Sequence, residues 1–134
     1  MTVRSRWDRV ALIALPAYWV ALFIATHYPR VKIPDQLPGK DKLVHFTAFG
    51  LLAFLRWRFE LARRPISTRF AWITAVVLIA YAAFDEYVQQ FVGRFTDPLD
   101  FLANASGIIV VLAVLELHRR WRPLPENTKP PGPR

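Results

Sequence analysis

The stretch VALIALPAYWVALFIATHY, residues 10–28, decides the fold class because it contains no Asp, Glu, Lys or Arg. These 19 residues, if helical, extend roughly 28 Å, close to the thickness of the hydrocarbon core of a bilayer. Three further apolar blocks cover residues 43 to about 59, 70 to about 92, and 100–117. Hydrophobic residues make up 54% of the chain and gather in these blocks rather than at amphipathic spacing. We therefore predict an all-α integral membrane protein, a four-helix transmembrane bundle.

The second block is the weakest candidate for a membrane span. Its apolar part is short, and it ends on Arg56 and Arg58. Both side chains would have to extend along the helix to the lipid headgroups. The sequence is therefore also compatible with three spans, or with a re-entrant second segment.

The basic residues are distributed unevenly between the loops. With four spans, the side that holds both termini and the loop between the second and third blocks carries 13 of the 18 Lys and Arg residues. The positive-inside rule then predicts that both termini are cytoplasmic. Topology and contact with anionic inner-leaflet lipid account for the net charge of +8. Membrane lipids, and not nucleic acid, are the predicted partners.

Composition outside the apolar blocks sets the predicted domain boundaries. We predict a transmembrane domain over residues 1–120 and a disordered, proline-rich cytoplasmic tail over residues 121–134, where prolines are frequent and apolar periodicity is missing. The absence of cysteine excludes thiol catalysis, cysteine-ligated metals and disulfides. No internal repeat is evident, which argues against an autonomous transporter.

A second signal is a cluster of polar residues that four spans would bring together near the outer headgroups. Its members come from the start of the second block, the end of the third, the following loop and the start of the fourth: Asp41, Lys42, His45, Asp85, Glu86, Gln89, Gln90, Arg94, Asp97, Asp100 and Asn104. Ionisable groups near a bilayer core are costly unless they pair, reach water or serve a site. Several members lie three or four positions apart, so each helix is expected to present a short polar stripe at its outer end.

Glu86, His45 and Asp41 are the candidate catalytic residues of this cluster. A carboxyl group and an imidazole can exchange protons with a ligand, and Asp41 lies four residues before His45, on the same helical face. Structural alternatives stay open. Glu86 would then be the ion-pair partner of Arg94, and His45 would simply be hydrogen-bonded to Asp41.

The candidate ligand-binding residues come from the same segments: Arg94, Gln89, Asp100, Asn104 and Lys42. Arg94 offers a planar fork of donors that suits phosphate or carboxylate. Asp97 is equally well explained as the N-cap of a helix that begins at Pro98. No metal site and no cofactor is predicted, because one histidine among scattered carboxylates lacks the spacing of a metal motif.

Three motifs give the chain a resemblance to a known family. They are DKLVHFTAFG (residues 41–50), DExxQ (85–89) with GR (93–94), and DPxDxxxNxxG (97–107). In this order and membrane context they resemble the VanZ-like family of bacterial membrane proteins over residues 24–117. The resemblance implies a small multi-pass protein of the bacterial cytoplasmic (inner) membrane and a link to low-level resistance to the glycopeptide teicoplanin. Gly50 and Gly107, which lie within the motifs, would allow close helix packing.

Two classes of function stay open from the sequence. The first is an outer-face site that acts on or binds a cell-envelope anion, lipid-linked or peptidoglycan-related, and contributes to glycopeptide resistance. The second is a non-enzymatic membrane scaffold or partner-binding protein whose polar cluster is structural. The residues do not decide whether the protein is an enzyme, because no nucleophile with an adjacent base stands out. They do not fix its oligomeric state.

Overall fold

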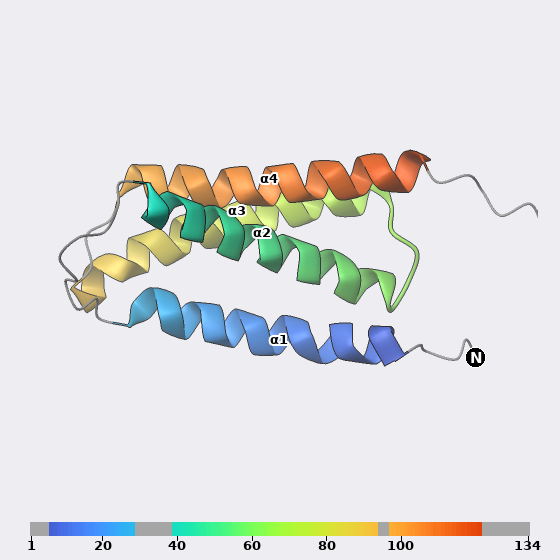
Figure 1. The fold of residues 1–134 in the computed structure, drawn as a ribbon, viewed down its shortest axis with the longest axis horizontal. Coiled ribbons are helices and arrows are strands. Elements are labelled where there is room, and N and C mark those ends of the chain that lie inside the picture. The colour runs from blue at the N-terminus through green and yellow to red at the C-terminus, as the bar shows by residue number, and fades with distance from the viewer. Residues whose placement is uncertain (1–5, 29–38, 94–96, 122–134) are drawn as a thin grey trace, which may run out of the picture.

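The computed structural model describes residues 6–28, 39–93 and 97–121, and all of its regular structure there is helical. The helices are α1 (Arg6–His27), α2 (Lys40–Leu61), α3 (Thr68–Gln89), which the short 3₁₀ turn η1 (Gln90–Val92) continues, and α4 (Pro98–Trp121). Successive helices run in opposite directions (Figure 1). The prediction of an all-α bundle of four helices is confirmed. The end at which α1 and α3 finish is called the polar end below, and the opposite end the arginine end.

Three helical segments are long and apolar enough to cross a membrane: Arg6–His27, Thr68–Val92 and Pro98–Trp121. Helix α2 has 22 residues as well, but charged residues occupy both of its ends. The bundle exposes apolar side chains along its length, including Ile13, Val20, Val76 and Val114. Apolar surface on this scale suits a lipid environment and would be a liability in water. The chain is a membrane protein.

Exposed aromatic residues mark the two ends of the bundle. Trp7, Trp72 and Trp121 are each more than two-thirds exposed and lie near the arginine end. Tyr28 and Tyr87 are exposed near the polar end. Tyrosine and tryptophan concentrate where a membrane meets water, so the two ends match the two interfaces of a bilayer.

The packing of α2 against α4 depends on two glycines, as predicted. A Cβ atom on Gly107 would lie far inside contact distance of the carbonyl oxygen of Phe46, and only 3.2 Å from the amide nitrogen of Gly50. A Cβ on Gly50 would meet the side chain of Val111 at 3.2 Å. The two backbones therefore approach closely, and side chains such as Phe49 are fully buried beside them.

Helix α1 joins this pair from the side. The hydroxyl of Tyr18 donates a hydrogen bond of 2.9 Å to the carbonyl oxygen of Ala48 on α2. The rings of Trp19 and Tyr81, on α1 and α3, meet edge to face with centroids 5.2 Å apart. Pro16 lies within α1 without ending it.

The helix boundaries differ from the predicted blocks by a few residues. Helix α2 begins at Lys40 instead of 43, so Asp41 and Lys42 lie in its first turn. Helix α4 begins at Pro98, and the Asp97 side chain accepts a hydrogen bond of 2.9 Å from the amide of Leu99. The capping role predicted for Asp97 is confirmed. Of the predicted tail, only Trp121 lies within the described residues.

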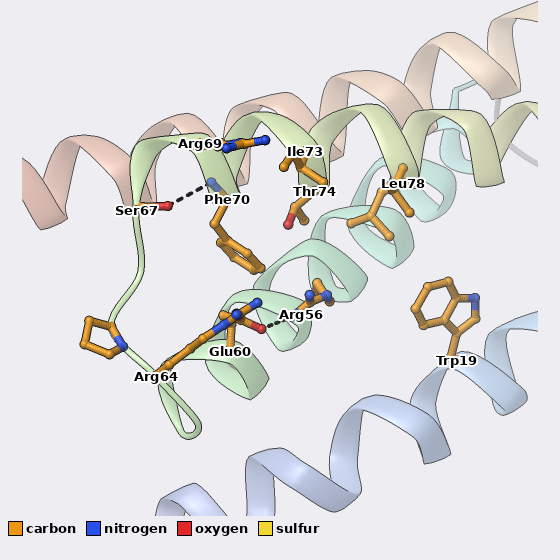
Figure 2. Close-up of a pocket in the computed structure, with 12 residues that line it drawn as sticks. Trp19, Arg56, Glu60, Arg64, Ser67, Arg69, Phe70, Ile73, Thr74 and Leu78 are labelled. Atoms are coloured by element: carbon orange, nitrogen blue, oxygen red, sulfur yellow. Dashed lines mark hydrogen bonds and ion pairs between the residues drawn. The ribbon is translucent and has the colours of Figure 1, made fainter.

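At the arginine end, an ion cluster links the end of α2 to the connection that leads to α3 (Figure 2). Glu60 is 3% exposed and pairs with Arg56 and Arg64. Ser67 caps α3 by accepting a hydrogen bond of 3.2 Å from the amide of Phe70. The two ends of the bundle therefore both carry polar chemistry, of different kinds.

Candidate functional site

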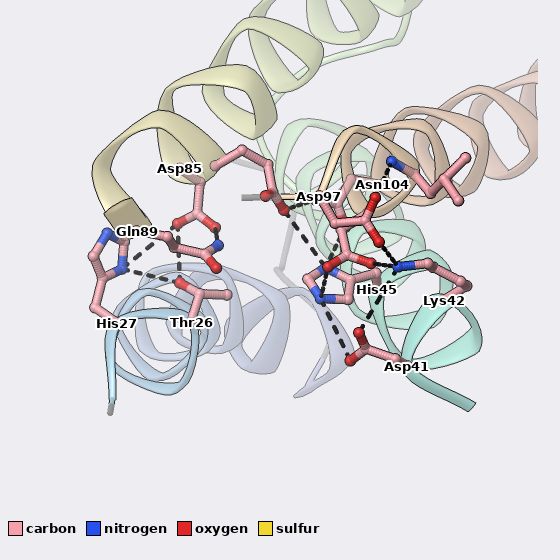
Figure 3. Close-up of polar contacts among 12 residues, drawn as sticks. Thr26, His27, Asp41, Lys42, His45, Asp85, Gln89, Asp97 and Asn104 are labelled. Atoms are coloured by element: carbon pink, nitrogen blue, oxygen red, sulfur yellow. Dashed lines mark hydrogen bonds and ion pairs between the residues drawn. The ribbon is translucent and has the colours of Figure 1, made fainter. Parts of the chain in front are cut away.

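The structure brings polar side chains from all four helices together at the polar end, in two groups (Figure 3). The Asp85 group lies between α1 and α3 and comprises Thr26, His27, Asp85 and Gln89. The His45 group lies among α2, α3 and α4 and comprises Asp41, Lys42, His45, Glu86, Asp97, Asp100 and Asn104. Residues that lie far apart in sequence meet because the antiparallel helices bring these four helix ends to one level.

The Asp85 carboxylate is fully buried and is held mainly by neutral donors. The hydroxyl of Thr26 donates to Oδ1 at 2.9 Å, and the amide of Gln89 donates to Oδ2 at 2.9 Å. The Nδ1 atom of His27 lies 3.7 Å from Oδ1. The ring of His27 stacks on that of Phe23, with centroids 4.1 Å apart. These donors replace the water that the carboxylate loses on burial.

His45 forms the centre of the second group and is 5% exposed. Its Nδ1 lies 3.1 Å from Oδ1 of Asn104, while Nδ2 of Asn104 donates to Glu86 at 3.4 Å. Since an amide oxygen only accepts, this arrangement places a proton on Nδ1. The Nε2 atom then faces Asp100 at 3.6 Å and Asp41 at 3.9 Å. Nε2 is therefore the ring nitrogen that faces the two carboxylates.

Lys42 ties the start of α2 to the start of α4. Its ammonium group donates to the carboxylates of Asp97 and Asp100 and lies 3.9 Å from Asp41. The hydrogen bond from Lys42, with that from the Leu99 amide, holds the pKa of the Asp97 carboxyl below its usual range. The Lys42 ammonium group thus compensates several carboxylates where α2 and α4 begin.

Three residues of the His45 group could contribute ligands to a cation. Asp41, His45 and Asp100 each offer an atom, and these atoms lie within 4.8 Å of one another. One imidazole nitrogen and two carboxylate oxygens would suit a divalent metal. The Lys42 ammonium, however, already contacts both carboxylates and supplies positive charge there. The absence of a metal site stays a prediction.

A groove of about 300 Å³ opens beside the His45 group. It lies between the end of α3 and the start of α4, and Glu86, Tyr87, Asp97 and Phe101 line it. Glu86 is 7% exposed and also contacts Asn104 and His45. Glu86 is therefore the residue through which a molecule in the groove would meet the buried network.

Most of the predicted site residues converge in the His45 group: Asp41, Lys42, His45, Glu86, Asp100 and Asn104. Gln89 instead belongs to the Asp85 group, and Gln90 is exposed and donates to the carbonyl oxygen of Tyr87. Arg94, the predicted anion ligand, lies outside the described residues.

Sequence reasoning missed Thr26 as a member of the site. It is 8% exposed and reaches Asp85 across 59 positions of sequence. The only local signal was a hydroxyl beside a histidine at the end of the first apolar block. Asp85 was recognised as a polar-cluster residue, but its burial between α1 and α3 depends on tertiary packing.

Comparison with known proteins gives one finding. A protein-family model described as VanZ/LLP1 matches residues 3–119, which is most of the chain. No curated protein and no solved structure matches the chain.

Proposed function

The chain belongs to the VanZ/LLP1 family, and we propose that it is a four-span protein of the bacterial cytoplasmic membrane whose polar end faces outward and binds or acts on a cell-envelope ligand. Charge supports this orientation. All nine arginines of the described residues lie within about two turns of the arginine end. The positive-inside rule would place that end, with both termini, in the cytoplasm.

The observation that carries the proposal is the path from the groove to His45. Glu86 borders the groove and accepts from Asn104 at 3.4 Å, and Asn104 contacts Nδ1 of His45 at 3.1 Å. Glu86 also lies 3.9 Å from the same imidazole nitrogen. In the proposed role, Glu86 exchanges a proton with the ligand, while Asn104 and His45 hold the Glu86 carboxyl group in position.

The proposed ligand is a lipid-linked or peptidoglycan-related anion. A groove at the outer interface, lined by Tyr87 and Phe101 as well as by carboxylates, suits a molecule with both apolar and polar parts. Lys42 offers positive charge near the groove, although it is shared with Asp97 and Asp100. The further cation in this proposal is Arg94, on the strength of its place in the sequence between Gly93 and Asp97.

A structural role is the second candidate, and one observation favours it. The polar contacts at this end cross between helices: Thr26 joins α1 to α3, and Lys42 joins α2 to α4. Polar contacts between helices can fix the register of a bundle without binding anything. A substitution in the polar end that keeps the shape and hydrogen bonding of a side chain, but removes its ionisable group, would preserve a structural role and abolish proton transfer.

The test is teicoplanin susceptibility of a sensitive bacterium that expresses the wild type, Glu86→Gln or Glu116→Gln at equal levels. Glu116→Gln is the matched control, since it neutralises a carboxyl group on α4 at the arginine end. We expect the wild type and Glu116→Gln to protect, and Glu86→Gln to lose protection while its melting temperature in detergent stays close to that of the wild type.

Full protection by Glu86→Gln would contradict a proton-transfer role. An Arg94→Lys variant tests the anion site in the same assay, because lysine keeps the charge and loses the planar fork of donors. If expression of the wild type left the teicoplanin sensitivity of the bacterium unchanged, teicoplanin protection would be excluded as the activity of this chain.

A further inference from the structure

A cavity of about 420 Å³ lies at the arginine end, between α1, α2 and α3 (Figure 2). Arg56, Glu60, Arg64 and Arg69 line its polar part. Trp19 of α1 lies on its opposite side. None of these residues belongs to the polar end, so this cavity is separate from the proposed ligand site.

The polar part of the cavity carries excess positive charge. Arg56, Arg64 and Arg69 line it together with one carboxylate, Glu60, which accepts from Arg56 at 3.0 Å and from Arg64. Each of these guanidinium groups donates to Glu60 through one nitrogen, and a guanidinium carries five N–H donors. Within the part of the chain that the structure describes, both therefore keep donors for a bound anion. Phosphate oxygens match this planar donor geometry.

Arg56 is held in place before any anion arrives. The guanidinium carbon of Arg56 lies 4.7 Å from the centroid of the Phe70 ring, a cation–π contact. Glu60, at 3% exposure, fixes the same side chain by an ion pair. The N-terminus of α3, capped by Ser67, lies beside the cavity and adds the positive end of a helix dipole. A bound anion would therefore meet a preorganised guanidinium at Arg56.

The other wall of the cavity is apolar and runs along α3. Ile73 and Val77 line it, and each is 52% exposed. Val77 lies about 12 Å along the helix from Arg69, toward the middle of the bundle. Trp72, exposed beside them, marks the level of the membrane interface. A ligand of this cavity would place its anion at the interface and its apolar part in the hydrocarbon.

We propose that this cavity binds an anionic phospholipid, with the phosphate on Arg56, Arg64 and Arg69 and an acyl chain along Ile73 and Val77. The combination of three arginines and an apolar wall selects a lipid over a free phosphate, which would use only the polar part. The lipid would come from the leaflet at the arginine end, where anionic headgroups attract basic residues. This inference does not depend on the ligand of the polar end.

The test measures stabilisation of the full chain in a neutral detergent by three probes: short-chain phosphatidylglycerol, short-chain phosphatidylcholine and inorganic phosphate. The readout is the melting temperature as a function of probe concentration. Phosphatidylglycerol should stabilise the wild type more than either other probe. In Arg64→Gln/Arg69→Gln its apparent affinity should fall about tenfold or more, because charge-assisted hydrogen bonds to the headgroup are lost.

Arg58→Gln/Arg63→Gln is the matched control, since it removes two positive charges from the same end but from outside the cavity. It should keep the wild-type response to phosphatidylglycerol. An equal loss of affinity in both double variants would indicate diffuse attraction and overturn the proposal. So would equal stabilisation of the wild type by phosphatidylglycerol and phosphatidylcholine, or by phosphatidylglycerol and inorganic phosphate.

Val77→Trp tests the apolar wall without changing any charge. The larger side chain would fill the space proposed for the acyl chain, so it should weaken phosphatidylglycerol binding by about tenfold. An unchanged affinity would overturn the placement of the acyl chain along α3. Because Val77 is half-exposed, this variant remains informative if an arginine variant fails to fold.

Discussion

The two ends of the bundle compensate their carboxylates in different ways. At the arginine end, Glu60 and Glu116 are each paired with two arginines. At the polar end, Lys42 pairs with Asp97 and Asp100. The two carboxylates nearest the bundle centre have neutral partners instead, since Asp85 is held by a hydroxyl and an amide and Glu86 contacts an amide and an imidazole. Arginine stays charged at any physiological pH, whereas imidazole and carboxyl groups exchange protons. The arginine end is therefore electrostatically fixed, and the proton transfer in our proposal is assigned to the polar end.

The largest expected effect comes from disturbing the close contact between α2 and α4, which lies between the two ends. In Gly107→Ala, the new methyl group would collide with the backbone of Phe46, which cannot move without displacing α2 from α4. We expect a destabilisation of about 3 kcal/mol or complete loss of folded protein. Thermal unfolding in detergent measures it.

Gly50→Ala is the control for that substitution, because its nearest neighbour is a side-chain methyl of Val111 at 3.2 Å, which can shift. Gly50→Ala should lower the free energy of unfolding by about 1 kcal/mol, less than Gly107→Ala. If the alanine at position 107 left the melting temperature unchanged, the close backbone approach of α2 and α4 would be wrong.

A smaller effect is expected from Asp85→Ala, which breaks the compensation at the polar end alone. The substitution leaves the amide of Gln89 without its buried acceptor, whereas the hydroxyl of Thr26 can still donate to the carbonyl oxygen of Phe23 at 3.1 Å. One unsatisfied buried donor costs about 1–3 kcal/mol. A double-mutant cycle with Thr26→Val, read by thermal unfolding, should show coupling of about 1 kcal/mol between the two positions. Additive effects would mean that the hydrogen bond between α1 and α3 contributes nothing.

The helices and the level of the polar residues along them were predictable from the sequence. A block of apolar residues fixes where a helix lies in a bilayer, so Asp41, Glu86 and Asp100 were bound to fall near one end. The Asp97 cap and the close packing at Gly107 were also predictable, because both depend on local geometry.

The division of the polar end into two groups was not predictable. It depends on the rotation of α1 about its own axis, which places Thr26 against Asp85, and nothing local encodes that rotation. The same limit applies to Glu60. In sequence it is one acid among basic residues, and only packing of α2 against α3 buries it beside Arg56 and Phe70.

The effect of salt on stability should differ between variants of the two ends, because ionic strength screens exposed charges more than neutral hydrogen bonds. Glu60→Gln removes the ion pairs with Arg56 and with Arg64, whose side chain is 71% exposed. Its cost, about 1–2 kcal/mol at low salt, should shrink in about 1 M NaCl, where the Debye length is about 3 Å. The cost of Asp85→Ala should not change with salt. Thermal unfolding of both variants at the two ionic strengths checks this, and equal salt dependence would contradict the distinction.

The smallest expected effect lies at the rim of the polar end, where Asp97 pairs with Lys42. The pKa of Asp97 is lowered from 3.8 mainly by that hydrogen bond. A lowered pKa in the folded state means that the contribution to stability is complete above the ordinary pKa and is lost as the pH falls through the lowered value. Asp97→Asn should therefore lower the melting temperature slightly at pH 6 and flatten its decline below pH 4. Because Lys42 also contacts Asp100, the fold should survive the substitution. If the wild type and the variant lost stability in parallel below pH 4, the ion pair of Lys42 with Asp97 would contribute nothing, and Asp97 would act only as the cap of α4.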